Sequence, residues 1–436
     1  MHLKIGSSQC LIASSASVAK DIMKDHDLIF SSRPEFDTSG YNIYSGSSFF
    51  LAEYGDYWRF MKKLCMTKLL GTPQLNSYIG IRWEEVQGLI QTLTKSYEGS
   101  KRVDMGVEFT TMTNNMICRM VMSKTCLGTS TDAEECIKLV GEVLDLAGKM
   151  RVGDILGPLK KFDLFGYGKR LGNVLEWFDT LMEKIMKEHE ESDEIRERKD
   201  IMDMLLEIYR DPTAEVKLTR RNINSFILEL FMAGTDTSSE GLQWALAELI
   251  NNPKVFNKLR KEIDTVTGKT RLIEESDVPN LPYLQAVIKE TLRVHPPGPL
   301  ILRKCREDCT INGFQVKKET RMLINIYTVM RDPEAWKDPE SFIPERFLSD
   351  SDECIGEHQM EMKGMNFRFI PFGSGRRGCP GASLVLNVMH TTIGAMVQCF
   401  DFPHDECKVD LEEGSGFSTT LKHPLMCNPV PRPNLF

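Results

Sequence analysis

The stretch that decides the fold reads Phe372-Gly373-Ser374-Gly375-Arg376-Arg377-Gly378-Cys379-Pro380-Gly381, late in a chain of 436 residues. Because proline favours the first turn of a helix, the stretch predicts a helix that begins at Pro380 with Cys379 at or near its N-cap. Free N–H groups at the helix start and the two arginines would stabilise a thiolate there. Such a thiolate serves as a nucleophile or a metal ligand. A buried structural cysteine is the plainer alternative, but it needs neither the glycines nor the arginines.

Other interpretations of these residues fail. Gly373, Gly375 and Gly378 match the dinucleotide pattern G-x-G-x-x-G, but the chain ends too soon after them for a doubly wound domain, and Pro371 interrupts the strand that should come first. No Gly-Lys-Ser/Thr sequence closes a phosphate-binding loop. Zinc needs about four clustered ligands, and the nearest pairs in the sequence, Cys305 with Cys309 and His404 with Cys407, are far apart.

The composition is that of a globular protein with a large core. Hydrophobic residues make up 41% and charged residues 27% of the chain, which excludes a disordered or collagen-like protein. The net charge of -8 gives no basic surface for nucleic acid, so we expect a small-molecule or protein partner. Twelve scattered cysteines are too few for a disulfide scaffold. We expect no signal peptide and no spanning helix, since no apolar run approaches about 20 residues.

Helical periodicity dominates the chain, with a minor share of strands. Strands are expected within 2–15, 309–316 and 321–326 and near 417–421, and helices over 17–26, 57–70, 75–96, 108–122, 133–146, 171–189, 219–250, 281–294 and 380–398. The helix over 219–250, with Thr219 as its N-cap, would run unbroken for about 48 Å, although its centre holds poor helix formers. Segment 152–168 is either a mobile lid or a loop packed on the core. We predict one domain, residues 1–436, mainly α with small discontinuous sheets.

A family resemblance rests on four motifs. The cysteine stretch resembles the haem-ligand loop of the cytochrome P-450 haem-thiolate monooxygenases, F-x-x-G-x-R-x-C-x-G, matched by Phe372, Gly375, Arg377, Cys379 and Gly381. Three further family motifs precede it: W-x-x-x-R/K at 58–62, A-G-x-D-T at 233–237, and E-x-x-R at 290–293 with its partner P-E-R-F at 344–347. Each motif alone has a plain structural explanation, but their order over nearly the whole chain indicates the family. The resemblance implies a helical domain with haem b between the long central helix and the cysteine loop.

The resemblance also implies a role for each matched residue. Cys379 would be the iron ligand, in a loop shaped by Phe372 and Gly375. The haem propionates would be held by Arg377, Trp58, Lys62 and Arg303, with Lys62 standing where many relatives have arginine. Thr237 and Asp236 would deliver protons to the dioxygen reaction, beside room left by the missing side chain of Gly234. A buried charge cluster would consist of Glu290, Arg293 and Arg346.

Substrate contacts follow from family analogy alone. Phe231, Leu300, Ile301 and Phe417, together with the loop over 33–52, would line a lipophilic pocket. Segments 57–65 and 280–287 are similar to plant microsomal members that oxidise flavonoids and triterpenoids. Such enzymes sit on the cytosolic face of the endoplasmic reticulum and take electrons from NADPH through a flavoprotein reductase. Their usual membrane anchor and proline-rich hinge are not found in this sequence, so we expect a truncated form.

Two other functions stay open at this point. One is a haem-binding protein without turnover, if truncation has removed what catalysis needs. The other is a haem-thiolate isomerase or dehydratase, which would not use dioxygen. The intact Asp236-Thr237 pair argues against the second, because such enzymes have less need of proton delivery.

Overall fold

A computed structural model describes residues 1–5, 8–34, 44, 46–125, 135–136, 138–143, 145–146, 165–192, 198–348, 367–403, 408–416 and 418–432. The helices are α1 (Ala16–Lys20), α2 (Asp56–Leu64), α3 (Thr72–Ser77), α4 (Ile79–Glu98), α5 (Met105–Met122), α7 (Tyr167–Glu191), α8 (Ile201–Arg210), α9 (Arg220–Gly234), α10 (Asp236–Asn251), α11 (Pro253–Thr267), α12 (Pro282–Val294), α13 (Ile326–Val329) and α14 (Ala382–Cys399). The strands are β1 (His2–Ile5), β2 (Ser8–Ala13), β3 (Val103–Asp104), β4 (Leu300–Lys304), β5 (Cys309–Ile311), β6 (Phe314–Val316), β7 (Arg321–Asn325), β8 (Phe400–Asp401), β9 (Met426–Cys427) and β10 (Val430–Pro431).

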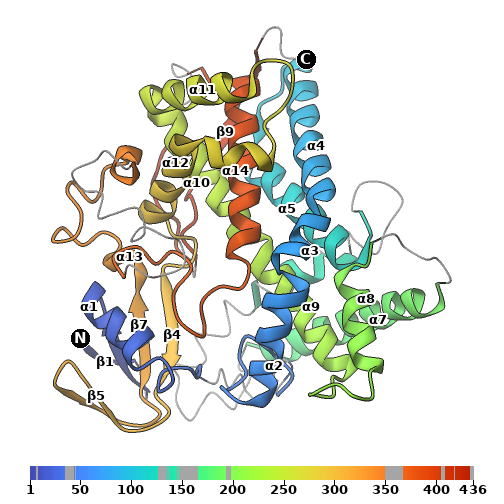
Figure 1. Ribbon diagram of the computed structural model, residues 1–436, viewed down its shortest axis with the longest axis vertical. Coiled ribbons are helices and arrows are strands. Elements are labelled where there is room, and N and C mark those ends of the chain that lie inside the picture. The colour runs from blue at the N-terminus through green and yellow to red at the C-terminus, as the bar shows by residue number, and fades with distance from the viewer. Residues whose placement is uncertain are drawn as a thin grey trace.

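The largest sheet lies at one end of the molecule, at the lower left of Figure 1. Its strand order is β1-β2-β7-β4, and within the described residues three two-stranded sheets accompany it. Strand β7 runs parallel to β2 and antiparallel to β4. A bridge between Ser32 and Lys304 joins the segment after α1 to the edge strand β4. This bridge brings Arg33 next to the strand that carries Arg303.

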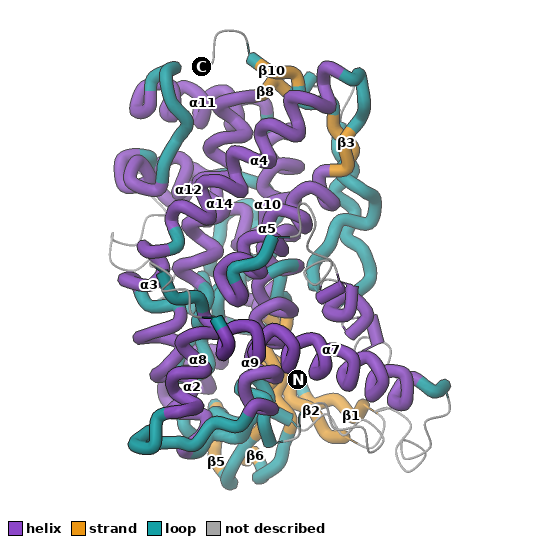
Figure 2. Tube along the Cα trace, turned by 90° about the vertical axis from the view of Figure 1, so that its right-hand side faces the viewer, coloured by secondary structure: helices purple, strands orange, loops and turns teal. Residues whose placement is uncertain are grey.

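Helices α10 and α14 form the middle of the molecule. Helix α10 packs against α5, α12 and α14, and Figure 1 shows this pair between α12 on one side and α4 and α5 on the other. Figure 2 shows α7 lying across the direction of α4, beside α8 and α9. Most of the second half of α14 is buried, because its apolar residues face neighbours on all sides. The mainly helical fold with small separate sheets confirms the predicted fold class.

The long helix expected over 219–250 is two helices, which corrects the prediction. Thr219 is the N-cap, as predicted, and closes a capping box with Asn222. The break falls at Thr235, whose φ of -86° and ψ of -71° lie at the edge of the right-handed helical region. Its hydroxyl donates to Oδ1 of Asn114 on α5, at 2.8 Å. A side chain that bonds outside the helix competes with helical geometry, and the poor helix formers on both sides do not resist it.

The helix after the cysteine begins later than predicted. Helix α14 starts at Ala382 with Gly381 as N-cap, so Cys379 lies near the N-cap, two residues before it. The reason is the turn before it, in which the N–H of Gly378 donates to the carbonyl oxygen of Gly375 at 3.0 Å. The N–H of Cys379 likewise donates to the carbonyl oxygen of Phe372, at 3.0 Å. These bonds hold the loop in place up to the cysteine.

Several other boundaries differ from the sequence predictions. Strand β4 was not among the expected strands, and the predicted helix over 75–96 is divided into α3 and α4. Two predicted helices end in π-turns, at Asp21–Asp25 and Cys65–Leu69. Most of the proposed lid, over 152–164, lies outside the described residues.

One described helix, α14, is long and apolar enough to cross a membrane by length and composition. Two thirds of that segment are buried inside the fold. Burial to this extent is typical of a core helix, so its apolar character reflects packing in the interior.

Candidate active site

The cysteine loop contains turns that only glycine adopts easily. Gly373 and Gly375 have φ of +65° and +69°, a region that favours glycine. A Cβ on Gly375 would lie 2.5 Å from the carbonyl oxygen of Met23 and 2.6 Å from Oδ1 of Asp27. The loop therefore packs directly on the segment after α1, and this contact fixes the position of Cys379.

Cys379 is both deep in the protein and accessible. The residue is solvent-exposed by surface area, yet desolvation by the surrounding protein raises the pKa of its thiol. The N–H groups of Gly381 and Ala382 and the charge of Lys62 act in the opposite direction and favour the thiolate. A sulfur that is exposed and desolvated at once lies on the wall of an internal space.

The two arginines of the loop do not favour the thiolate, contrary to expectation. Arg376 pairs with Asp27 at 2.7 Å. Arg377 donates from Nε to the carbonyl oxygen of Ser31 at 2.6 Å, and from its terminal nitrogens to the carbonyl oxygens of Phe50 and Ala52. Lys62 instead supplies the positive charge near the sulfur.

Lys62 and Trp58 reach the loop from α2. The ammonium group of Lys62 donates to the carbonyl oxygen of Gly378 at 2.8 Å. The guanidinium of Arg377 lies 4.5 Å from the ring centre of Trp58, a cation–π contact. Trp58 is buried and Phe372 is half-buried against the core. The W-x-x-x-R/K motif at 58–62 thus lies against the cysteine loop in space.

Three arginines gather at this place with little negative charge around them. Arg303 and Arg377 are 3% and 8% exposed. Burial lowers the pKa of Arg377 to about 9 and that of Arg33 to about 10. Burial, together with repulsion from Arg33 and Arg377, holds the pKa of Arg303 well below its usual range. Nε of Arg33 is buried and finds no hydrogen-bond partner among the described residues. Buried cations need anionic partners, so the cluster fits a ligand that carries more than one negative group.

The junction of α9 and α10 presents the other candidate residues. Thr237 and Ala233 are exposed although they lie in the middle of a core segment. The hydroxyl of Thr237 donates to the carbonyl oxygen of Ala233 at 2.6 Å. Burial raises the pKa of Asp236, so this carboxyl holds its proton to higher pH than a free aspartate.

Gly234 corrects one expectation. A Cβ on Gly234 would lie 2.9 Å from Cδ1 of Ile117 on α5. The missing side chain therefore lets α5 approach α9. It does not leave the room for a flat ligand that the sequence suggested.

The comparisons with known proteins agree with this geometry. The family model "Cytochrome P450" matches residues 1–428. The chain belongs to the cytochrome P450 family. A soybean (Glycine max) 3,9-dihydroxypterocarpan 6A-monooxygenase is 40% identical over 448 residues, covering 100% of this chain and 87% of the relative. A soybean beta-amyrin 24-hydroxylase is 41% identical over 442 residues, covering 99% of this chain and 86% of the relative.

A solved structure of a zebra fish cytochrome P450 with progesterone has the same fold. It matches with a TM-score of 0.82 and 24% identity, covering 99% of this chain and 96% of that one. As a cytochrome P450, this chain is a monooxygenase with haem as its cofactor, and with dioxygen and a small molecule as substrates. The residues fit haem, because a thiol, three under-compensated arginines and an internal space meet at one place.

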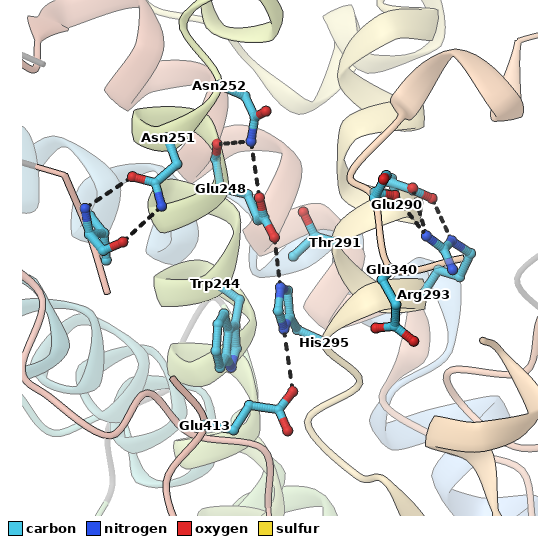
Figure 3. A network of polar contacts seen from close by, with 12 residues as sticks. Trp244, Glu248, Asn251, Asn252, Glu290, Thr291, Arg293, His295, Glu340 and Glu413 are labelled. Atoms are coloured by element: carbon cyan, nitrogen blue, oxygen red, sulfur yellow. Dashed lines mark hydrogen bonds and ion pairs between the residues drawn. The ribbon is translucent and has the colours of Figure 1, made fainter. Parts of the chain in front are cut away.

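The predicted charge cluster of this P450 is assembled and buried. Nε of Arg293 lies 2.7 Å from Oε2 of Glu290, and Nε of Arg346 lies 3.0 Å from Oε1. The N–H of Ile343 donates to Oε1 at 2.8 Å. Figure 3 shows Glu290 and Arg293 facing each other, to the right of the contacts of His295. The cluster ties α12 to the segment 338–346.

The residues predicted to contact substrate are scattered. Phe231 is fully buried and Leu300 is 38% exposed. Ile301 touches the cysteine loop, since its Cδ1 would lie 3.0 Å from a Cβ on Gly373. Phe417 lies outside the described residues, as does much of the loop over 33–52.

Sequence reasoning missed three charged groups of the site region. Arg33 was expected only as the first residue of a loop that lines the substrate pocket. Glu229 accepts hydrogen bonds from the Ser48 hydroxyl and from the N–H of Phe50, and burial raises its pKa to about 7. Glu240 lies one turn beyond Asp236. Nothing in the sequence distinguishes these residues from surface charges, although an acidic residue on the apolar helix α9 is a weak signal.

Proposed function

We propose that residues 1–436 form one catalytic domain that binds haem b through Cys379. In this proposal the chain oxidises a lipophilic plant specialised metabolite of the flavonoid or triterpenoid class. The observation that carries it is the arginine cluster Arg33, Arg303 and Arg377, buried beside the loop of an accessible cysteine. Haem supplies a dianionic edge for the cluster and an iron that takes a thiolate ligand and activates dioxygen.

The chain's own residues divide the work. The arginines hold the propionates, and Trp58 keeps Arg377 in place through the ring contact. The Gly381 and Ala382 N–H groups and Lys62 stabilise the sulfur as a thiolate. Thr237 and Asp236 hold and move protons, because a hydroxyl both donates and accepts and the raised pKa of Asp236 keeps a proton available.

The substrate class rests on relatives. The names of two relatives contain 3,9-dihydroxypterocarpan and beta-amyrin. These relatives match all or nearly all of this chain at 40% and 41% identity. Both compounds are fused-ring molecules with few charges, which suits a pocket of leucine, isoleucine and phenylalanine. Screening plant flavonoids and triterpenes for shifts of the haem absorption band, followed by product analysis, tests this assignment. Failure of every such compound to shift the band or to be oxidised would overturn it.

The partners are a flavoprotein reductase that uses NADPH and the cytosolic face of the endoplasmic reticulum membrane. This follows from the similarity to plant microsomal enzymes. Reconstitution with such a reductase should give NADPH-dependent oxidation. Haem incorporation without any reductase-dependent oxygen consumption would favour the alternative of a haem-binding protein without turnover.

The iron ligand is tested by spectroscopy. The reduced protein with carbon monoxide should show the red-shifted absorption band of thiolate ligation, and Cys379→Ser should lose it. Cys309→Ser is the matched control, because this partly exposed thiol lies on β5 and should leave the band unchanged. A normal band in the Cys379 variant would overturn the assignment.

A further inference from the structure

A small polar cavity lies beside α10. Its volume is about 150 Å³, and its lining includes Thr110 of α5, Thr420 of the C-terminal segment, and Asp236, Ser239, Glu240 and Gln243 of α10. A water molecule takes about 30 Å³ in the liquid, so the cavity has room for a few. Asp236 and Glu240 are the ionisable groups among its described lining residues.

Only one of the two carboxylate oxygens of Glu240 has a hydrogen-bond partner among the described residues. The residue is 8% exposed, and the hydroxyl of Ser418 donates to its Oε1 at 2.7 Å. Its Oε2 is buried and finds no hydrogen-bond partner among the described residues. A buried carboxylate without partners is costly, so this oxygen either carries a proton or is hydrated from the cavity.

The carboxyl groups of Asp236 and Glu240 are close enough to exchange protons. Asp236 and Glu240 stand at i and i+4 on α10, where Cβ atoms lie about 5–6 Å apart. Burial, and then the charge of Asp236, raise the pKa of Glu240 to about 8, and burial raises the pKa of Asp236. Within the described chain, Asp236 is the one charged group that acts on Glu240. Both groups thus change protonation closer to neutral pH than free carboxyls do.

The rest of the cavity wall consists of groups that pass protons. The Thr110 and Ser239 hydroxyls lie 2.8 Å apart, and Nε2 of Gln243 donates to the Ser239 hydroxyl at 3.2 Å. Each hydroxyl can reverse between donor and acceptor. A polar path therefore lies along the same face of α10 as the two carboxyls.

We propose that Glu240 relays protons from solvent to Asp236 through this cavity during the dioxygen reaction. The inference rests on the proposed function and assigns a proton source to it. Glu240 touches neither substrate nor cofactor and acts only through Asp236. Each proton that leaves its carboxyl towards Asp236 is replaced by one from solvent through the cavity, so the carboxyl ends as it began and no electron moves through it.

A purely structural role is the competing explanation. The Glu240–Ser418 bond anchors the C-terminal segment to α10, and Nε1 of Trp244 adds a bond to the carbonyl oxygen of Thr419 at 2.7 Å. Ser418→Ala breaks the anchor and keeps the carboxyl. Glu248→Gln makes the same chemical change two turns further along α10, at a buried carboxyl that pairs with His295 at 2.8 Å (Figure 3). Glu248 is not among the residues that line the cavity.

The first measurement needs no turnover. Infrared spectra of the haem-loaded protein should show a protonated-carboxyl band that shifts in D₂O and is lost as the pH rises through about 8. The band should be absent from Glu240→Gln and present in both Ser418→Ala and Glu248→Gln. Absence of such a band from the wild-type protein would overturn the proposal.

The second measurement follows the relay itself. With reductase, NADPH and beta-amyrin as the probe, the share of oxygen released as hydrogen peroxide is measured from pH 6 to pH 9, in H₂O and in D₂O. Glu240→Gln should raise this share several-fold, enlarge the solvent isotope effect and abolish the pH dependence near 8, and Glu240→Asp should restore part of each. If beta-amyrin is not a substrate, the share of oxygen released as hydrogen peroxide is compared between the wild type and the variants without it.

The outcomes separate the two proposals. An active wild-type enzyme whose peroxide share is unchanged in Glu240→Gln sinks the relay and leaves the proposed function standing. An equal defect in Ser418→Ala also sinks it, since the anchor alone would then explain the effect. A wild-type protein without the thiolate band or oxygen consumption fails at the proposed function instead.

Discussion

Arg303 shows how the burial of one side chain indicates the ligand. Its described hydrogen bond runs from a terminal nitrogen to the carbonyl oxygen of Leu302 at 3.1 Å. Arg33 and Arg377 repel it, and Asp27 attracts it only weakly by comparison. A lone buried cation of this kind destabilises a protein, so its place here makes sense as part of an anion site.

Replacing Arg303 should therefore have opposite effects on the empty and the loaded protein. Arg303→Met should stabilise the haem-free chain, on the order of 1–4 kcal/mol, because a buried charge among like charges is removed. The same change should speed haem loss to an acceptor protein, since a propionate partner is gone. Urea unfolding and haem-transfer rates measure the two effects. Arg306→Met, at an exposed arginine nearby, should change neither, and a destabilised haem-free Arg303 variant would contradict the prediction.

Glu290 has the opposite situation, with every oxygen in use. Glu290→Gln leaves Arg293 and Arg346 buried without their charge partner, so we expect a loss of about 3–5 kcal/mol of stability and poor haem incorporation. Denaturant midpoints and the haem-to-protein ratio measure this. The matched control is Glu207→Gln, since Glu207 and its partner Lys199 are 55% and 59% exposed and such pairs contribute about 1 kcal/mol or less. Equal losses in the two variants would contradict the argument.

At the scale of elements, the cysteine loop depends on contact with the segment after α1. Gly375 and Gly268 share a φ of +69°, but a Cβ at Gly268 meets nothing within 4 Å, whereas one at Gly375 meets the Met23 carbonyl oxygen at 2.5 Å. The pair thus separates backbone strain from a steric clash. The position of the cysteine is decided by packing between elements, and the loop sequence alone does not determine it.

Alanine at these two glycines makes the comparison. Gly268→Ala should cost about 1–3 kcal/mol, because its φ of +69° and ψ of -156° lie in a region that almost only glycine adopts. Gly375→Ala should cost clearly more and should reduce the thiolate-type carbon monoxide band, because the loop must move away from Met23. Thermal unfolding and the band intensity check both. Equal stability of the two variants would contradict the prediction, because it would show that a Cβ at Gly375 causes no costly clash with the segment after α1.

The division of the central helix at Thr235 is also a property of elements. The hydroxyl of Thr235 bonds to Asn114 of α5, and the hydroxyl of Thr113 lies 3.3 Å from the Thr235 carbonyl oxygen. These contacts open the helix at the point where Thr237 and Asp236 are presented. The tertiary contact at Thr235 therefore lies next to the two residues that we propose as proton carriers.

For the whole molecule, the buried carboxyls make stability depend on pH. Burial raises the pKa of Glu229 to about 7 and of Glu240 to about 8, from an ordinary value of 4.5. A raised pKa in the folded state gives stability that is fully present below the unfolded value and is lost as pH rises through the folded value. The protein should therefore lose stability between about pH 5 and pH 8 through these two groups.

The double variant Glu229→Gln/Glu240→Gln tests this. The free energy of unfolding is measured for both proteins from pH 5 to pH 9. The wild-type value should fall by several kcal/mol relative to that of the variant as the pH rises, and the difference should level off above about pH 8. The comparison cancels the opposite contribution of His390, whose pKa burial lowers to about 4. Parallel pH profiles for the two proteins would show that neither carboxyl is protonated in the fold.

Local sequence patterns predict much of the architecture. Periodicity located most helices of the second half, and Thr219 and Pro282 mark helix starts at or within one residue of their predicted places. The four motifs indicated the family because each is a short, contiguous pattern. Boundaries were wrong where a long-range contact overrode local preference, as at Thr235, and where a turn delayed the helix, as at the start of α14.

The sequence by itself determined the helical fold class and the kind of chemistry, and it singled out the cysteine proposed as the ligand, because these rest on residue types at fixed short spacings. Only the tertiary structure decided which charges surround the site. Arg33 and Arg303 meet through the pairing of β4 with residue 32, and Glu240 meets its cavity through α5 and the C-terminal segment. The physical reason is that burial and charge compensation depend on residues far apart in the chain, and no local pattern records which of them become neighbours.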